Sequence, residues 1–352
     1  MTPPEAETII TRRGSAGIIT LNRPKQLNAL THGMVQVIYP QMLAWRDDPT
    51  VTRVIIQGTG EKAFCAGGDI RALYDLGKAG RMAEALAFWR EEYTLNHLLK
   101  TYPKPVIALL NGIVMGGGVG MSFHGSHRVA SEKLMFAMPE VGIGFFPDVG
   151  ASFFLPRLKH HIGTYLAVSG ARIGLGDALD LGLVTHAVDS ARMAELAEAL
   201  TGDADVNSVL NDFAVAAPVA PLAEHHRMIA DVFSETSLPE IMAKLGQMAL
   251  GGSVFCANAL DSMRVKSPTS MAIALLQVRR GAAMTFAQVM QMEYRIVCRI
   301  IEGTDFYEGI RAAIIDKDNT PRWQPWRIED LTDAAVEAHF APLRHDLVLE
   351  SA

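Results

Sequence analysis

Two apolar, β-branched segments that end in glycine most constrain what this chain can fold into. They are "VTRVIIQGTG" (51–60) and "PVIALLNG" (105–112). Each has the composition of a buried strand, and each is followed by a glycine-rich connection and a stretch with helical spacing. Repeated units of strand, loop and helix need crossover connections, which make neighbouring strands parallel. The sequence therefore predicts an α/β fold with a largely parallel sheet.

The flanking sequence adds strands before these units and helices after them. The segment "ETIITRRGSAGIITLNRP" (7–24) predicts two short strands around a Gly-Ser-Ala-Gly turn, and 31–47 has helical spacing. After about Val188 the strand signals give way to Ala-, Leu- and Met-rich helical stretches, with "SPTS" (267–270) as a helix break and N-cap. A chain of 352 residues exceeds the usual size of one core, so we expect one large domain with an elaboration, or two domains.

Composition excludes several classes of protein. A net charge of −6 argues against a nucleic-acid binder. Cys65, Cys256 and Cys298 are odd in number and far apart, which favours reduced thiols over a disulfide framework. The first ten residues, "MTPPEAETII", lack the basic and apolar regions of a secretory signal. From these features we expect a cytoplasmic protein.

Neither a membrane span nor a metal site is predicted. The segment 105–123 carries no charge over a length close to that of a bilayer crossing, but it holds Asn111 and five glycines. Such a sequence suits a buried strand that runs through a turn into a helix. The histidines, including His124 and His127, lack a matching pattern of Cys or carboxylate ligands.

Two glycine-rich turns are candidates for main-chain binding of a ligand. "FCAGGDI" (64–70) and "NGIVMGGGVGM" (111–121) each follow an apolar strand and open a predicted helix, so their N–H groups can point into one cleft. Glycine permits a ligand to approach the main chain closely. Neither turn is a Walker A loop or a dinucleotide fingerprint. Tight packing of helix on sheet explains either turn alone, but here both occur together with an acidic segment.

That acidic segment is "MPEVGIGFFPDVG" (138–150), in which Glu140 and Asp148 stand among glycine, proline and bulky apolar residues. Ionised groups are costly to bury without partners, so two acids in this setting are candidates for acid–base or nucleophilic chemistry. Apolar neighbours such as Phe145 and Phe146 would desolvate both acids. A structural interpretation stays open beside the catalytic one: Asp148 caps a helix that begins near Val149, and Glu140 is paired structurally.

Taken together, the motifs "FCAGGDIRAL", "MGGGVGM", "FAMPEVGIGFFPDVGASFFLPRL", "MEYRI", "DFYEGIRAAIIDKD" and "PRW" resemble the crotonase superfamily, in particular its 3-hydroxyisobutyryl-CoA hydrolase branch. The resemblance runs from the first strand pair to about residue 340. It implies a ββα superhelix with a helical C-terminal region. We therefore expect an acyl-CoA-binding core over 1–190 and a mostly helical region over 191–352 that closes the site and makes subunit contacts.

The resemblance also implies roles for individual residues. Crotonases hold the thioester oxygen between two backbone N–H groups, which by motif position are those of Gly68 and Gly117. Enoyl-CoA hydratases of the superfamily commonly use two glutamates, and the first of those positions is Gly120 here. What remains matches the hydrolase arrangement, with Glu140 and Asp148 as the catalytic pair.

Substrate contacts are implied in the same way. Glu92, in "REEY" (90–93), is the candidate for the β-hydroxyl, although an Arg-Glu-Glu run is otherwise most often a solvated helix face. Gly117, Glu140 and Asp148 would also contact substrate. The CoA phosphates need cations, and Lys25 in "NRPKQLNAL" and Arg71 after "GGDI" are candidates that otherwise read as surface residues.

The expected function is hydrolysis of a short β-hydroxyacyl-CoA, with 3-hydroxyisobutyryl-CoA of valine breakdown first and 3-hydroxypropionyl-CoA second. No cofactor is expected, because coenzyme A is part of the substrate. An enoyl-CoA isomerase or hydratase is an alternative, since an isomerase needs only one base and the same oxyanion hole. A non-catalytic CoA-binding module is a third hypothesis. We expect an acyl-CoA as the partner and leave a homo-oligomer open.

Overall fold

The structure, a computed structural model, describes residues 6–349. Within that range a six-stranded sheet has the order β1-β2-β3-β5-β7-β9, and only the β1–β2 pair is antiparallel. The strands are β1 (Thr8–Arg13), β2 (Ala16–Leu21), β3 (Arg53–Gly58), β5 (Val106–Leu110), β7 (His127–Ala130) and β9 (His186–Ala187). The predicted hairpin and the predicted parallel sheet are both confirmed.

A second, smaller sheet has three strands, which alternate along the chain with strands of the large sheet. Its parallel strands are β4 (Ala63–Cys65), β6 (Ile113–Met115) and β8 (Met135–Ala137). Three strands of the large sheet, β3, β5 and β7, are each followed by a short strand of the small sheet, and helical structure comes next. This alternation is the predicted ββα repeat. The short strands between the long strands and the glycine-rich turns have no signal in the sequence, because a strand of three residues is too short to show a period.

Helices cover both sheets and make up the chain after β9 in the described range. They are α1 (His32–Asp47), α2 (Ile70–Lys78), α3 (Met82–Thr101), α4 (Gly117–Gly120), α5 (Ala151–Phe154), α6 (Ile162–Ser169), α7 (Leu175–Asp180), α8 (Met193–Ala199), α9 (Val206–Phe213), α10 (His226–Phe233), α11 (Leu238–Leu250), α12 (Val254–Arg264), α13 (Pro268–Gly281), α14 (Phe286–Ile300), α15 (Asp305–Ile310) and α16 (Asp333–Glu337). Ser267 caps α13 through the N–H of Ser270, as "SPTS" predicts.

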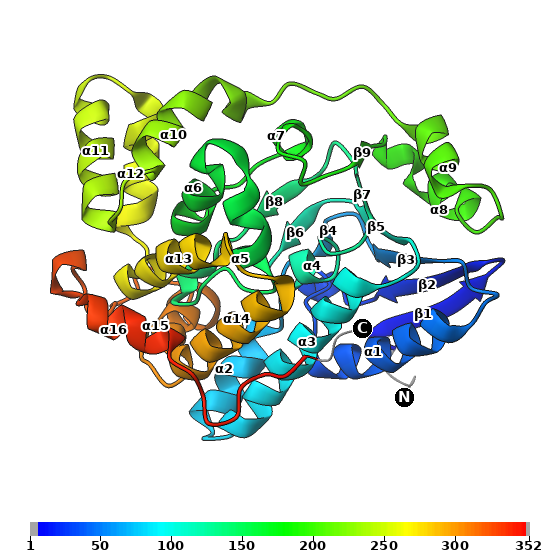
Figure 1. The fold of residues 1–352 in the computed structure, drawn as a ribbon, viewed down its shortest axis with the longest axis horizontal. Helices are drawn as coiled ribbons and strands as arrows, with labels where there is room; N and C mark the ends of the chain where they lie inside the picture. The colour runs from blue at the N-terminus through cyan, green and yellow to red at the C-terminus, as the bar shows by residue number, and fades with distance from the viewer. Residues whose placement is uncertain (1–5, 350–352) are drawn as a thin grey trace.

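The large sheet separates two hydrophobic layers. Because side chains alternate along a strand, Ile19 and Ile56 face the main core while Ile18 and Ile55 face the other side. That other side is covered by α8 and α9. Figure 1 shows these two helices at one end of the molecule and α10–α12 at the other, joined by an extended connection along the top edge.

The main core is continuous from the N-terminal strands to residues of the last segment, such as Leu347. The division of the chain at 190/191 stays a prediction, as do the predicted subunit contacts. The uncharged segment 105–123 forms β5, β6 and α4 rather than one long helix. Among residues 6–349 no helix is both long and apolar enough to span a bilayer.

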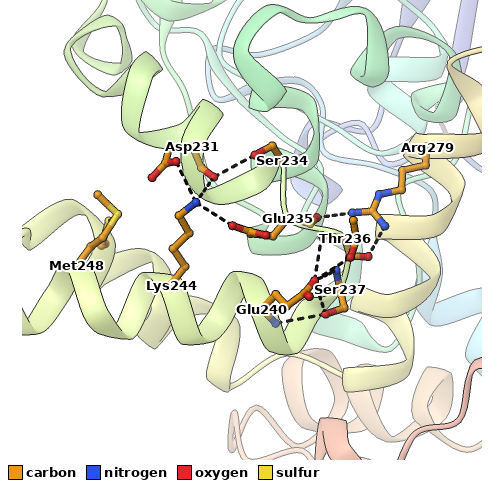
Figure 2. A network of polar contacts seen from close by, with 10 residues as sticks. Asp231, Ser234, Glu235, Thr236, Ser237, Glu240, Lys244, Met248 and Arg279 are labelled. Atoms are coloured by element: carbon orange, nitrogen blue, oxygen red, sulfur yellow. Dashed lines mark hydrogen bonds and ion pairs between the residues drawn. The ribbon is translucent and has the colours of Figure 1, made fainter.

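Polar contacts tie the corner between α10 and α11 to α13 (Figure 2). The ammonium of Lys244 contacts the carboxylates of Asp231 at 2.9 Å and Glu235 at 2.8 Å. Arg279 of α13 donates to the backbone carbonyls of Glu235 and Thr236. These contacts hold the α10–α12 helices against α13, which also contacts the acidic segment through Gln277.

Candidate active site

The three strands of the small sheet bring the predicted motifs together. Because β4, β6 and β8 are parallel neighbours, the loops that follow their carboxyl ends open at the same edge. These loops carry Gly68, Gly117 and Glu140, and they surround a cavity of about 190 Å³. The cavity is lined by Ala66, Gly67, Gly68, Ile70, Leu73, Phe88, Trp89, Glu92, Met115, Gly116, Gly117, Pro139, Glu140, Ile143, Phe145, Asp148 and Ile314.

The backbone N–H groups of Gly68 and Gly117 lie at this cavity, as the sequence predicts. Each follows a glycine with positive φ, Gly67 at 125° and Gly116 at 46°, which a residue with a side chain would adopt at a cost. A Cβ placed on Gly117 would lie 3.2 Å from the Gly68 nitrogen and 2.9 Å from Glu92 Oε1. Within residues 6–349 neither N–H donates a hydrogen bond, so both are free for a ligand oxygen.

Three carboxyl groups, those of Glu92, Glu140 and Asp148, line the same cavity and are almost fully buried. Burial raises the pKa of Glu140 and of Glu92 well above the usual range, and the charge of Asp148 adds to both shifts. Burial raises the pKa of Asp148 to about 7, although the hydroxyl of Tyr93 partly offsets this by donating to Oδ2 at 2.8 Å. The sequence left the direction of these shifts open, and the structure shows that all three are upward.

The structural interpretation of the two acids is wrong. Helix α5 begins at Ala151, two residues after the expected start, and Gly150 occupies its N-cap with no side-chain cap. The Asp148 side chain instead accepts from Tyr93. In the described range Glu140 Oε2 is buried without a hydrogen-bond partner, as is Glu92 Oε1, so neither acid is structurally satisfied. The alternative interpretation of Glu92, as part of a solvated helix face, is also wrong, because its side chain is buried.

Apolar side chains form much of the wall of the cavity. Phe145 lines it as expected, and its ring stacks on Trp89 with 5.7 Å between centroids. Phe146 is fully buried but does not line the cavity. The side chain of Ile314, from the C-terminal region, completes the lining. Because the three acids are buried, charges and dipoles beside them act more strongly than they would in solvent.

The candidate cations Lys25 and Arg71 do not line this cavity. Lys25 is exposed and lines a neighbouring cavity of about 340 Å³ together with Leu27 and Lys62. A backbone hydrogen bond at 3.0 Å joins Ala66 N–H, in the lining of the first cavity, to Leu27 O, in the lining of the second. Arg71 is exposed on α2 and lines neither cavity. Their role with CoA stays a prediction.

Sequence reasoning missed two buried residues behind Asp148, namely Tyr93 and Glu293. Both stood in quoted motifs, "REEY" and "MEYRI", without a role of their own. Glu293 accepts from the N–H groups of Gly150 and Ser152, and burial raises its pKa to about 8. The available signal was a glutamate at an apolar position of a helix, between Met292 and Tyr294.

His124, one of the histidines considered as a metal ligand, contacts the backbone instead. His124 is buried, its Nε2 lies 2.6 Å from the Val149 carbonyl oxygen, and burial lowers its pKa to about 3. Over residues 6–349 no group of three or more His, Cys, Asp or Glu side chains is arranged to hold a metal ion.

Alternating strands of two sheets, with glycine-rich loops around one acidic cavity, define the class: this is a crotonase-fold protein. The family model "Enoyl-CoA hydratase/isomerase" matches residues 16–340. The chain belongs to that family and, within it, to the 3-hydroxyisobutyryl-CoA hydrolase branch.

Individual relatives support this assignment. The chain is 46% identical to "3-hydroxyisobutyryl-CoA hydrolase, mitochondrial" of Gallus gallus, covering 98% of this chain and 91% of that protein. It is 43% identical to the Homo sapiens protein of the same name, covering 96% and 89%. Among solved structures it resembles a carnitinyl-CoA dehydratase from Mycobacterium thermoresistibile, with 37% identity, a TM-score of 0.94 and coverage of 99% and 100%. An enoyl-CoA hydratase from Rhodobacter sphaeroides has 39% identity, a TM-score of 0.91 and coverage of 98% and 100%.

These relatives correct the expected location. The hydrolases of Gallus gallus and Homo sapiens are named mitochondrial, which points to mitochondria and overturns the cytoplasmic expectation. Reduced cysteines indicate only a reducing compartment, and they do not distinguish one such compartment from another.

Proposed function

We propose that this protein hydrolyses short β-hydroxyacyl-CoA thioesters, with 3-hydroxyisobutyryl-CoA of valine breakdown as first substrate and 3-hydroxypropionyl-CoA as second. The observation that carries the proposal is one cavity that combines two free backbone N–H groups with buried Glu140 and Asp148. The names of the curated relatives agree with it.

In the proposed reaction the thioester carbonyl oxygen accepts hydrogen bonds from the N–H groups of Gly68 and Gly117. Negative charge develops on this oxygen when the carbonyl carbon is attacked, and each such donor is typically worth about 3–4 kcal/mol of barrier. Because the donors are main-chain groups, they are preorganised and need no rearrangement during the reaction.

Glu140 acts on the thioester carbon in its ionised form, by direct attack to form a mixed anhydride or by activating a water molecule, and because burial raises its pKa this form increases as the pH rises. The carbon–sulfur bond breaks and CoA leaves as the thiolate, which then takes up the proton that the water molecule loses, so that CoA is released as the thiol. In either route water supplies the oxygen of the new carboxylic acid. Asp148, also as a carboxylate, accepts a hydrogen bond from the attacking water and assists its loss of a proton. Glu92 binds the β-hydroxyl of the acyl group, for which its unpartnered Oε1 is available.

The size of the cavity restricts it to the acyl end of the substrate. At about 190 Å³ it is smaller than pockets that hold whole drug-sized ligands, which span about 300–1,000 Å³. The CoA body must therefore lie outside it. Lys25 and Arg71 are proposed to contact the CoA phosphates, and the Lys25 cavity lies on the adjoining wall. We propose no further cofactor and an assembly of several copies through the helical region.

A hydratase is the main alternative, because the similar solved structures are named as a dehydratase and a hydratase. The packing around Gly120 argues against it. A Cβ at Gly120 would lie 2.8 Å from Asn96 Nδ2 and 2.9 Å from the Cβ of Val149, so this packing leaves no room for a glutamate there. An isomerase needs only Glu140 as base, and a CoA-binding module needs neither acid. Thiol release distinguishes the hydrolase from both of these alternatives, because neither of them cleaves the thioester.

The first test measures thiol release with a chromogenic disulfide. The substrates are 3-hydroxyisobutyryl-CoA, 3-hydroxypropionyl-CoA, acetyl-CoA and crotonyl-CoA, each with native protein, Glu140→Gln and Asp148→Asn. We expect rapid release from the two hydroxyacyl substrates and a loss of about 100-fold or more in kcat for folded Glu140→Gln.

Other results would decide against a hydrolase. Hydration of crotonyl-CoA without thiol release would establish the hydratase, and migration of a double bond would establish the isomerase. Tight binding of acyl-CoA with no turnover of any substrate would support the binding module.

A further inference from the structure

Glu293 is a fully buried acid that the proposed reaction does not use. It lies on α14, and its two carboxylate oxygens accept from the backbone N–H groups of Gly150, at 2.7 Å, and Ser152, at 3.0 Å. No lysine, arginine or histidine pairs with it among residues 6–349. A buried carboxylate without a cation is costly, so its retention at this position needs an explanation.

The chain that Glu293 holds is strained. Val149 has φ of 51°, a left-handed conformation that is a genuine outlier for a β-branched residue. Gly150 follows with φ of 88°, and a Cβ there would lie 2.6 Å from the His124 ring. Such backbone persists only where surrounding contacts over-determine it, and it occurs most often at functional sites. The turn begins at Asp148, the acid that faces the cavity.

Contacts from several separate elements hold this turn. Gln277 of α13 donates to the Pro147 carbonyl at 2.5 Å, and the His124 ring contacts the Val149 carbonyl. Tyr93 of α3 holds the Asp148 carboxylate itself. Glu293 contributes the two contacts that fix the far end of the turn, where the chain enters α5. A helix of four residues does not itself require so costly a buried acceptor.

We propose that Glu293 is a positioning residue that holds the strained Val149–Gly150 turn and thereby aims the Asp148 carboxylate at the thioester. This assignment rests on the proposed function. Replacing Glu293 should lower kcat and leave KM nearly unchanged, because the acyl group is bound by other walls of the cavity, among them Phe88 and Trp89. Displacement of a reacting group by about 1 Å can cost about 100-fold in rate.

The test compares Glu293→Gln and Glu293→Ala with native protein in the thiol-release assay on 3-hydroxyisobutyryl-CoA. Gln keeps the shape and one good acceptor, so we expect it to lower kcat about 10-fold, whereas Ala removes both acceptors and lowers kcat about 100-fold. KM should stay within about threefold of native in both variants. Because a smaller folded fraction would also lower the apparent kcat at constant KM, kcat is expressed per folded enzyme, with the folded fraction of each variant measured by circular dichroism. Gln is nearly isosteric, so it keeps the test valid if the Ala variant does not fold.

Asp177→Asn is the matched control. Asp177 is also buried and also accepts a backbone N–H, that of Leu222 at 2.8 Å, but it lies outside the cavity. Its replacement should leave kcat unchanged. Folded Glu293 variants with native kcat would overturn the assignment, as would an equal loss of kcat in Asp177→Asn. If native protein releases no thiol from any substrate, the proposed function itself fails, and the assignment fails with it.

Discussion

Opposing influences set the acidity of Asp148, whose carboxyl group is buried beside Glu92 and Glu140. Burial raises its pKa to about 7 by penalising the charged form, and the hydroxyl of Tyr93 favours the charged form by donating to it. The balance leaves Asp148 able to change protonation state near neutral pH, which suits a group that assists proton transfer.

Replacing Tyr93 by Phe removes the donor and keeps the ring. Because the hydroxyl lowers the pKa of Asp148, its loss raises that pKa further above 7. The proposed reaction needs the Asp148 carboxylate, so activity is lost as pH falls through this pKa. We therefore expect the acidic limb of the kcat/KM profile to move up by about one pH unit in Tyr93→Phe.

The matched control is Tyr102→Phe, which also removes a hydroxyl donor, here from a half-buried side chain to the Met42 carbonyl at 2.8 Å and away from the cavity. Its acidic limb should coincide with that of native protein. A limb that stays in place or moves down in Tyr93→Phe would contradict the role given to this hydroxyl.

At the scale of elements, the sequence reveals features that have local patterns and hides those that depend on long-range contacts. The long strands, the hairpin, the glycine-rich turns and the two acids each have a signal within about ten residues. The three-residue strands that align those turns have none. Tyr93 meets Asp148 from 55 residues away and Glu293 meets Gly150 from 143 residues away, so no local pattern assigns their roles.

The C-terminal region reaches the cavity through one irregular element. The π-helical turn η7 (Arg311–Ile315) follows α15 directly, and Ile314 on it lines the cavity. Arg311 anchors this turn through Glu308, at 2.8 Å, and Asp316 and Asp318, both at 2.7 Å. π-Helical turns are rare and often occur at functional sites. We therefore predict that Ile314 limits the length of the acyl group.

Shortening that wall should widen the range of substrates. In Ile314→Ala, we expect the ratio of kcat/KM for 3-hydroxyhexanoyl-CoA over 3-hydroxyisobutyryl-CoA to rise about tenfold, because one to a few methylenes in an apolar pocket are worth about 1–3 kcal/mol. Ile315→Ala removes the same atoms from the adjacent residue, which does not line the cavity, and should leave the ratio unchanged. An equal ratio in all three proteins would show that Ile314 does not limit acyl length.

At the scale of the whole molecule, the buried acids of the site lower the free energy of unfolding. Glu92, Glu140, Asp148 and Glu293 are all buried and all have a raised pKa, so their ionisation opposes folding. In the unfolded chain these acids ionise near their ordinary pKa, whereas in the folded chain they hold their protons to higher pH. The folded state therefore binds more protons over this range, and the free energy of unfolding falls as pH rises. Activity and stability are in opposition at this cavity.

Removing one of these acids should therefore stabilise the protein while abolishing its chemistry. For Asp148 the penalty begins above the ordinary value of 3.8 and is complete above about 7. We expect Asp148→Asn to match native protein near pH 4 and to exceed its free energy of unfolding by on the order of 2–4 kcal/mol at pH 8, measured by urea unfolding. In Asp346→Asn the free energy of unfolding should change in the opposite direction, because Arg295 lowers the pKa of Asp346 and so stabilises the fold at high pH. That variant should lose stability at pH 8, and the loss should shrink as pH falls below 3.8 through the lowered pKa of Asp346. A difference between native protein and Asp148→Asn that does not grow with pH would show that Asp148 is not held at a raised pKa by its buried position.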